Sequence, residues 1–338
     1  MQDRDADDYR ALKRDMIVRA LAQHGLESAS VEAVVSVPPR SRRRATLKIL
    51  KQSGQIRIGF HAVHSHDIVD MRECLVLTPA LFELVQHLRA CFARLSGEGE
   101  SAELYTVQAD NGFDLAVSWN RKTTPALIAE IAAFAPRLGL VRVTAGEDLI
   151  YQSAVPEVCF GKARVKLVPR AFLQPTRDGE AVLQARVLEI TAKARNVVDL
   201  FSGCGTFSLP LAERAKVHAV DADGALLDAL AAAARVTSGL KPVTTEKRDL
   251  FKRPLTPQDL NRFDALVLDP PRSGALAQAK MLAKSDLRRI AYVSCDAASF
   301  ARDAKVLTDG GFRLAWVVGV DQFLWSAHVE LAAAFIRD

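Results

Sequence analysis

The chain has 338 residues, 49% of them hydrophobic, which suffices for one large or two ordinary domains with buried cores. Its five irregularly spaced cysteines argue against a disulfide framework and indicate a reducing, cytoplasmic setting. No apolar stretch is long enough to predict a membrane span, and the net charge of +5 permits a nucleic-acid partner without requiring one.

The first predicted element is a helix over residues 9–24. Leu12, Ile17 and Leu21 recur there at helical spacing, and Gly25 provides a stop signal. We expect residues 1–36 to form a helical segment that packs on a later domain.

Residues 37–170 predict a central α+β domain. Ser53-Gly54 and Asn111-Gly112 each separate two strand-like runs, which predicts two hairpins. An amphipathic pattern over residues 79–95 predicts a helix between them.

A basic cluster opens this central domain. Seven cationic residues within positions 40–57 could neutralise phosphates, although a solvated strand edge would show the same pattern. The cluster comprises Arg40, Arg42, Arg43, Arg44, Lys48, Lys51 and Arg57.

From residue 171 to 338 strands and helices alternate strictly. Such alternation predicts an α/β domain with a doubly wound, Rossmann-like parallel sheet. Two final strands with a short connection predict a terminal antiparallel hairpin, the variation found in class I methyltransferases. The predicted strands are 196–201, 217–221, 242–247, 263–269, 288–294, 312–320 and 327–336.

A glycine turn follows the first of these strands. Asp199 precedes Gly203 and Gly205, and Asp221 ends the next strand, where an acid suits ribose hydroxyls. The third glycine of a dinucleotide loop is missing, so S-adenosylmethionine is favoured over NAD. A nucleotide-binding or purely structural turn is the alternative.

Two further strand ends carry polar side chains. Asp269 follows an apolar run and begins Asp269-Pro-Pro-Arg272, where Arg272 replaces the aromatic residue used by amino-group methyltransferases. Cys295 follows another strand, and Asp296 is a predicted N-cap of the next helix. We expect that helix N-terminus to lower the thiol pKa, although a small buried hydrophobe is the alternative.

Five ordered motifs resemble the RNA uridine-5-methyltransferases, most closely their ribosomal-RNA branch. Upstream, Ser65-His66-Asp67-Ile68-Val69-Asp70 also resembles that branch. The five motifs are Phe172-Leu-Gln174, Asp199-Leu-Phe-Ser-Gly-Cys-Gly-Thr206, Asp269-Pro-Pro-Arg-Ser-Gly274, Val293-Ser-Cys295 and His328-Val-Glu330.

The resemblance implies a role for each matching residue. Cys295 would add to carbon 6 of uracil, and Glu330 would remove the carbon-5 proton. Taken alone, Glu330 would more often be an exposed strand carboxylate, and the preceding His328-Val329 favours the catalytic role. Phe172 would stack on RNA, with Arg42, Arg43 and Arg44 as further RNA contacts. The contacts to S-adenosylmethionine would be Gln174, Phe201, Thr206, Asp221, Asp249 and Asp269.

The chain departs from this family in three respects. It lacks the β-barrel and three of the four cysteines that hold an iron–sulfur cluster in the ribosomal branch, so Cys74 matches a former ligand position and no cluster is expected. Either the cluster was lost or the sequence starts downstream of the true N-terminus. Asp296-Ala297 and Thr176 replace the usual Asn-Pro and Asn.

The resulting hypothesis is methylation of carbon 5 of a uridine in structured RNA, with large-subunit ribosomal RNA favoured over transfer RNA, by a cytoplasmic monomer. Two alternatives stay open. One is an amino-group or small-molecule methyltransferase, and the other is an RNA-binding protein with a degenerate methyltransferase domain.

Overall fold

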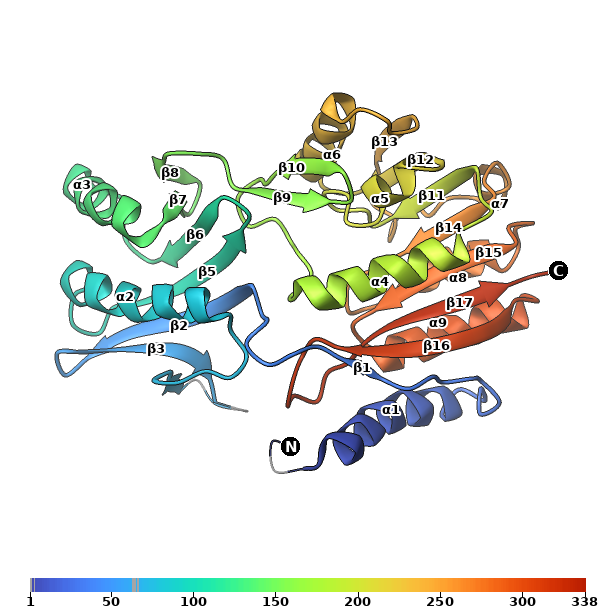
Figure 1. The fold of residues 1–338 in the computed structure, drawn as a ribbon, viewed down its shortest axis with the longest axis horizontal. Helices are drawn as coiled ribbons and strands as arrows, with labels where there is room; N and C mark the ends of the chain where they lie inside the picture. The colour runs from blue at the N-terminus through green and yellow to red at the C-terminus, as the bar shows by residue number, and fades with distance from the viewer. Residues whose placement is uncertain (1, 3, 63–64, 66) are drawn as a thin grey trace. The chain divides into compact units, whose positions relative to one another are not determined.

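The computed structural model describes residues 2, 4–62, 65 and 67–338. His66 of the upstream motif lies outside them. The chain divides into two compact units (Figure 1). The larger unit contains residues 1–37, 159–165 and 178–338, and the smaller unit contains residues 38–158 and 166–177. The domain ranges expected from the sequence stay a prediction.

The larger unit is built on an eight-stranded sheet of order β1-β16-β17-β15-β14-β11-β12-β13. Its strands pair in parallel except β17, which is antiparallel to β15 and β16. The strands are β1 Val35–Ser36, β11 Asn196–Leu200, β12 Lys216–Asp221, β13 Val243–Lys247, β14 Ala265–Leu268, β15 Arg289–Ser294, β16 Arg313–Asp321 and β17 Glu330–Ile336. The predicted doubly wound sheet with a terminal hairpin is therefore confirmed.

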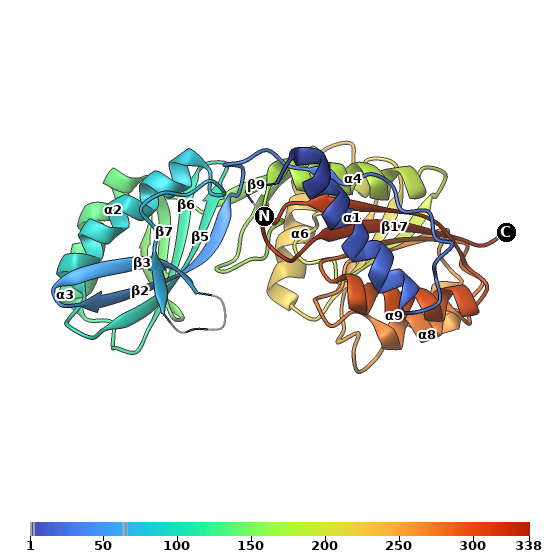
Figure 2. The same cartoon turned by 90° about the horizontal axis from the view of Figure 1, so that it is seen from below.

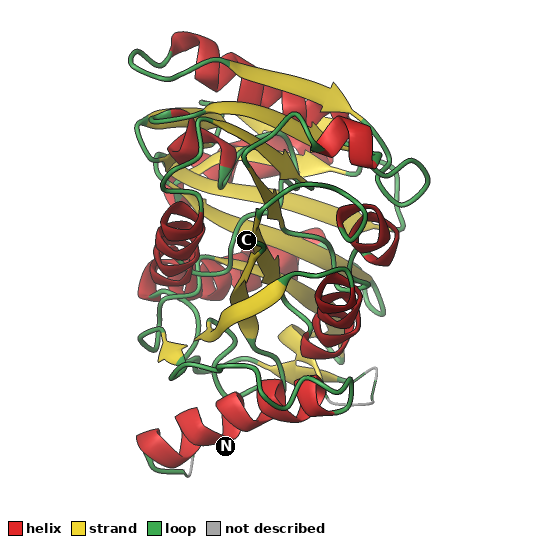
Figure 3. Ribbon diagram, turned by 90° about the vertical axis from the view of Figure 1, so that its right-hand side faces the viewer, coloured by secondary structure: helices red, strands yellow, loops and turns green. Residues whose placement is uncertain are grey.

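Helices cover both faces of this sheet (Figure 3). Because β14 is buried on both sides, its residues alternate between two cores: Leu266 and Leu268 pack with α8 and α9, and Ala265 and Val267 pack with α4 and α5. Helix α1 packs against α9 on the first face (Figure 2). The helices are α1 Ala6–Ala22, α4 Arg177–Ile190, α5 Ser208–Ala212, α6 Gly224–Val236, α7 Pro257–Leu260, α8 Leu276–Leu282 and α9 Ala297–Asp309.

The smaller unit has a seven-stranded sheet of order β4-β3-β2-β5-β6-β7-β8. One face packs against α2 and α3, and both predicted hairpins are present, closed by the pairs Gln52–Gln55 and Ala109–Gly112. Its elements are β2 Arg44–Gln52, β3 Gln55–His61, β4 Ile68–Asp70, α2 Pro79–Leu95, β5 Ser101–Ala109, β6 Gly112–Trp119, α3 Pro125–Phe134, η1 Ala135–Leu138, β7 Leu140–Ala145 and β8 Asp148–Gln152. A separate pair, β9 Glu157–Phe160 and β10 Ala163–Lys166, forms a two-stranded sheet.

In the part of the chain that the structure describes, no helix is both long and apolar enough to cross a bilayer. The same residues contain no cluster of three or more histidine, cysteine or acidic side chains arranged to hold a metal ion.

Candidate active site

The carboxyl ends of neighbouring parallel strands bring the predicted site residues of the larger unit to one edge of the sheet. The strand order reverses between β14 and β11, and open α/β sheets bind ligands at such a reversal. Asp269 follows β14, the glycine turn follows β11, and Asp221 ends β12.

The glycine turn is held by the acids around it. Asp221 Oδ2 accepts a hydrogen bond of 2.9 Å from the Gly203 amide, and Oδ1 accepts one of 2.9 Å from the Asp223 amide. Phe201 has a φ of 60°, an unusual left-handed conformation for a large side chain. Strain of this kind concentrates at functional turns.

The buried atoms of this turn fit a polar ligand. Asp199 Oδ2 accepts from Ser208 Oγ at 2.6 Å, whereas Asp199 Oδ1 and Ser202 Oγ are buried with no hydrogen-bond partner among the described residues. A Cβ at Gly203 would meet no heavy atom within 4 Å, so the turn leaves open space there. This donor and acceptor set suits S-adenosylmethionine.

A second aromatic ring, which the sequence interpretation missed, lies next to Phe201. The ring centroids of Phe201 and Phe251 are 5.4 Å apart, and Phe251 is half exposed. Asp249, two residues earlier, accepts from the Phe251 amide at 3.0 Å. An aromatic residue two positions after a strand-end acid was the available sequence signal.

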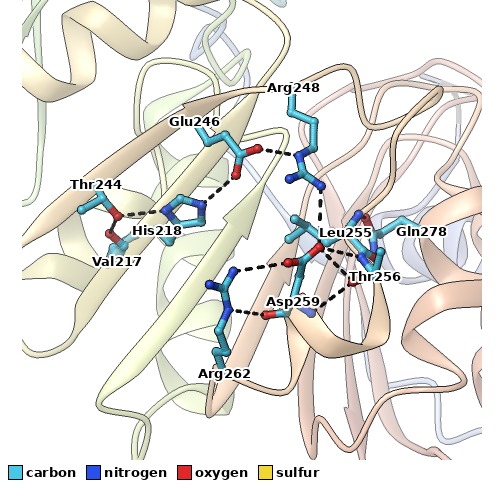
Figure 4. Close-up of polar contacts among 10 residues, drawn as sticks. All are labelled: Val217, His218, Thr244, Glu246, Arg248, Leu255, Thr256, Asp259, Arg262 and Gln278. Carbon is cyan, nitrogen blue, oxygen red and sulfur yellow. Dashed lines mark hydrogen bonds and ion pairs between the residues drawn. The ribbon is translucent and has the colours of Figure 1, made fainter.

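A polar network supports the segment that carries Asp249 (Figure 4). Arg248 Nε donates to Glu246 at 2.6 Å, and its Nη1 lies 3.8 Å from Asp259 Oδ2. His218 of β12 contacts Glu246 at 3.2 Å and Thr244 at 2.9 Å. Asp259 is also the N3 residue of a capping box that begins α7. These contacts tie strand β13 and the segment after it to the sheet and to α7.

Thr206 is buried in the turn, and its carbonyl accepts from Gln184 Nε2 at 2.9 Å. Its backbone is therefore anchored to α4. Cys204, two residues earlier in the turn, is also buried, which fits a packing residue.

Cys295 and Glu330 lie at the same edge of the sheet. Ser294 pairs with Leu331 in antiparallel register, so Cys295 and Glu330 are the next residues on the two neighbouring strands. Glu330 Oε2 accepts from Gln322 Nε2 at 3.3 Å, and both residues are buried. No sequence pattern indicated a functional role for Gln322.

The thiol of Cys295 lies close to the carboxylates of Glu330, Asp269 and Asp296. Burial, the charge of Glu330 and the charge of Asp269 raise the pKa of Cys295 to about 11. The expected lowering by the helix N-terminus is therefore wrong here, because desolvation and the carboxylates outweigh it. Burial and Glu330 likewise raise the pKa of Asp269 well above its usual value.

Asp296 is the N-cap of α9, as predicted, accepting from the Ser299 amide at 2.9 Å. It also accepts from Arg272 Nε at 3.2 Å, and these contacts lower the Asp296 pKa against the effect of burial. Asp296, which replaces the family's usual Asn, thus connects the loop that carries Arg272 to the N-terminus of α9.

In the smaller unit, the predicted RNA-binding residues differ in how far their side chains are exposed to solvent. Phe172 is 56% exposed and its ring lies 4.3 Å from the Arg44 guanidinium. Arg43 is only 2% exposed, and its Nε donates to the Gln174 carbonyl at 3.2 Å. Arg42 donates from Nε to the Arg44 carbonyl at 3.0 Å, and burial together with the charge of Arg44 lowers its pKa to about 10.

Cys74, the predicted former cluster ligand, is half-buried against the core of the smaller unit. Its sulfur accepts from the Leu77 amide at 3.4 Å. None of the five cysteines forms a disulfide, and Cys91 is buried on α2.

Comparison with known proteins agrees with this geometry. The fold is shared with the Pyrococcus abyssi tRNA (uracil-54, C5)-methyltransferase crystallised with S-adenosyl-L-homocysteine, with a TM-score of 0.75 at 20% identity over 99% of this chain and 84% of that one. The larger unit thus has the fold of class I, S-adenosylmethionine-dependent methyltransferases.

The sequence comparisons show the family. The family model for tRNA (Uracil-5-)-methyltransferase matches residues 143–337. An uncharacterized RNA methyltransferase of Rhizobium meliloti is 39% identical over 96% of this chain and 78% of its own length. The 23S rRNA (uracil(1939)-C(5))-methyltransferase RlmD of Pectobacterium atrosepticum is 33% identical over 93% of this chain and 72% of its own. The chain belongs to the tRNA (uracil-5-)-methyltransferase family, and it is an S-adenosylmethionine-dependent RNA methyltransferase, as the resemblance predicted.

Proposed function

We propose that the protein methylates carbon 5 of a uridine in large-subunit ribosomal RNA through a covalent adduct with Cys295. One observation carries this proposal: Cys295, Asp269 and Glu330 lie at the ends of neighbouring strands, close enough for the charges of both acids to raise the pKa of the thiol. The similarity to a ribosomal-RNA enzyme over 93% of the chain favours that substrate over transfer RNA.

In this mechanism Cys295 loses its thiol proton to water and reacts as the thiolate. It forms an S–C6 bond, and the π electron pair of the uracil C5–C6 double bond moves toward carbon 5. When bound, S-adenosylmethionine supplies the methyl group and a sulfonium charge that offsets the surrounding carboxylates. Glu330 then takes the carbon-5 proton, the C5–C6 double bond re-forms, and the S–C6 bond breaks to return the thiolate.

The remaining candidate residues would serve binding. Asp221 suits the ribose hydroxyls, and Phe201 and Asp249 suit the adenine, with Thr206 and Asp269 as further cofactor contacts. The cofactor contact that the resemblance implies for Gln174 of the smaller unit stays a prediction. Phe172 and Arg44 would offer a stacking surface for an unpaired base, with Arg42 beside them. The burial of Arg43 suits support of the Gln174 segment better than direct phosphate contact. A cytoplasmic monomer remains a prediction.

The proposal is tested with RNA that contains 5-fluorouridine, whose fluorine cannot leave as a proton does. Large-subunit ribosomal RNA transcripts should form an adduct that survives denaturation and is absent in Cys295→Ala, and Cys204→Ala serves as the matched cysteine control. Methyl transfer that persists in Cys295→Ala would contradict the covalent mechanism. Adducts with transfer-RNA transcripts alone would overturn the substrate assignment.

A further inference from the structure

Three polar side chains without a role in the proposed chemistry lie inside the larger unit. Lys13 of α1 and Asp321 at the end of β16 have side chains that are 0% exposed, and Lys13 Nζ lies 2.9 Å from Asp321 Oδ1. Tyr9, one turn earlier on α1, donates its hydroxyl to Asp321 Oδ2 at 2.6 Å. Burying such a charge pair is costly and seldom stabilises a fold by itself, so this network calls for another explanation.

The network holds the connection between β16 and β17, residues 322–329. Lys13 Nζ donates to the Phe323 carbonyl at 3.2 Å and also to the His328 carbonyl. The Trp325 amide donates to the Tyr9 hydroxyl at 2.8 Å. Two side chains of one helix thus bind the beginning, the middle and the end of this connection.

The connection leads directly to the proposed base. Gln322, its first residue, donates to Glu330 at 3.3 Å. Val320, next to Asp321, pairs with Glu330 across the hairpin. A displacement of residues 322–329 would therefore move Gln322 and Glu330 together.

Helix α1 is itself anchored to the sheet independently of this connection. Val35 and Ser36 pair with Val320 and Asp321 in parallel register. A Cβ at Gly319 would lie 2.9 Å from Ile17 Cδ1, so glycine permits the close contact between α1 and β16. The helix can therefore act as a fixed support for the connection.

We propose that Tyr9 and Lys13 are positioning residues for the proton-removal step: by binding the 322–329 connection they hold Gln322 and Glu330 where the carboxylate faces the uracil adduct. This inference rests on the proposed role of Glu330. It predicts that the N-terminal helix controls one chemical step rather than RNA binding or cofactor binding.

The test is single-turnover kinetics of Tyr9→Phe on unmodified large-subunit ribosomal RNA transcripts. Methyl incorporation into RNA reports the transfer step, and decay of the methylated protein–RNA adduct reports proton loss and elimination. We expect methyl incorporation to change less than about twofold and adduct decay to slow about tenfold.

A second variant guards against misfolding. Lys13→Met combined with Asp321→Asn removes both buried charges together and should also slow adduct decay. Arg14→Met is the matched control. Arg14 of the same helix donates to the Val31 carbonyl at 3.0 Å and, among the described residues, makes no hydrogen bond or ion pair with residues 322–329. It should leave adduct decay unchanged. All variants are compared at one temperature below their melting temperatures.

The outcomes separate this inference from the proposed function. Slow adduct decay in Glu330→Gln but normal decay in Tyr9→Phe and the double variant would overturn the positioning role alone. Equal slowing of both steps would also overturn it, since it would indicate a general structural role. Normal turnover by Glu330→Gln would instead refute Glu330 as the base.

Discussion

The core of the smaller unit and the strand-end site of the larger unit treat buried acids in opposite ways. In the smaller unit Asp114 is matched by Arg142, which donates to both carboxylate oxygens at 2.8 and 2.6 Å, and both side chains are almost fully buried. In the larger unit burial and the charges of Asp269 and Asp221 raise the pKa of Asp199, and burial and the charges of Glu330 and Asp269 raise the pKa of Cys295. A buried acid that is matched by a cation is already compensated within the fold, whereas acids gathered together indicate a site that awaits a cationic or proton-donating ligand.

The largest effect is expected from breaking the matched pair. Arg142→Met leaves a buried, uncompensated carboxylate and should cost about 3–5 kcal/mol of unfolding free energy. Lys48→Met is the control, because its ion pair with Glu103 is partly exposed and should be worth about 0–1 kcal/mol. Chemical denaturation measures both, and equal losses would show that burial does not distinguish these pairs.

Replacing Asp199, one of the gathered acids in the larger unit, should raise the unfolding free energy relative to the wild type as pH rises. Burial, ahead of the charges of Asp269 and Asp221, raises the pKa of Asp199 to about 7 from an ordinary value near 4. A raised pKa stabilises the fold at low pH, and that stability is lost as pH rises toward 7. Relative to the wild type, Asp199→Asn should therefore gain up to about 4 kcal/mol between pH 4 and 7.

Denaturation at several pH values checks this, with exposed Asp228→Asn as the baseline. A difference between Asp199→Asn and the wild type that does not vary with pH would contradict it. The variant should also bind S-adenosylmethionine less tightly by titration calorimetry, so that the gain in stability comes with a loss of function.

The sequence was sufficient where a local pattern determines the outcome. The N-cap role of Asp296 and the strand-end places of Asp269 and Cys295 follow from a few neighbouring residues, and the structure contains them all. Helix α3 was missed, because only Leu127 and Ile131 of its alanine-rich stretch are buried and no clear periodicity marks them.

Contacts between distant residues could not be predicted in this way. The thiol pKa depends on burial and on Glu330 and Asp269, which belong to other segments of the chain, so the helix N-terminus behind Cys295 predicted the wrong direction. The hydrogen bond from Tyr9 to Asp321 joins residues 312 positions apart, and no local pattern announces it.

The smallest effect concerns the thiol itself. After burial, the charge of Glu330 is the largest cause that raises the pKa of Cys295 to about 11. Glu330→Gln should therefore lower the pH midpoint of Cys295 alkylation by iodoacetamide by about one unit. Asp296→Asn is the matched comparison. Its charge contributes least among the three acids and is already paired with Arg272, so the midpoint should move less. Mass spectrometry of the Cys295 peptide across pH 7–12 gives both midpoints, and a larger shift in Asp296→Asn would mean that the helix cap, rather than the gathered acids, controls the nucleophile.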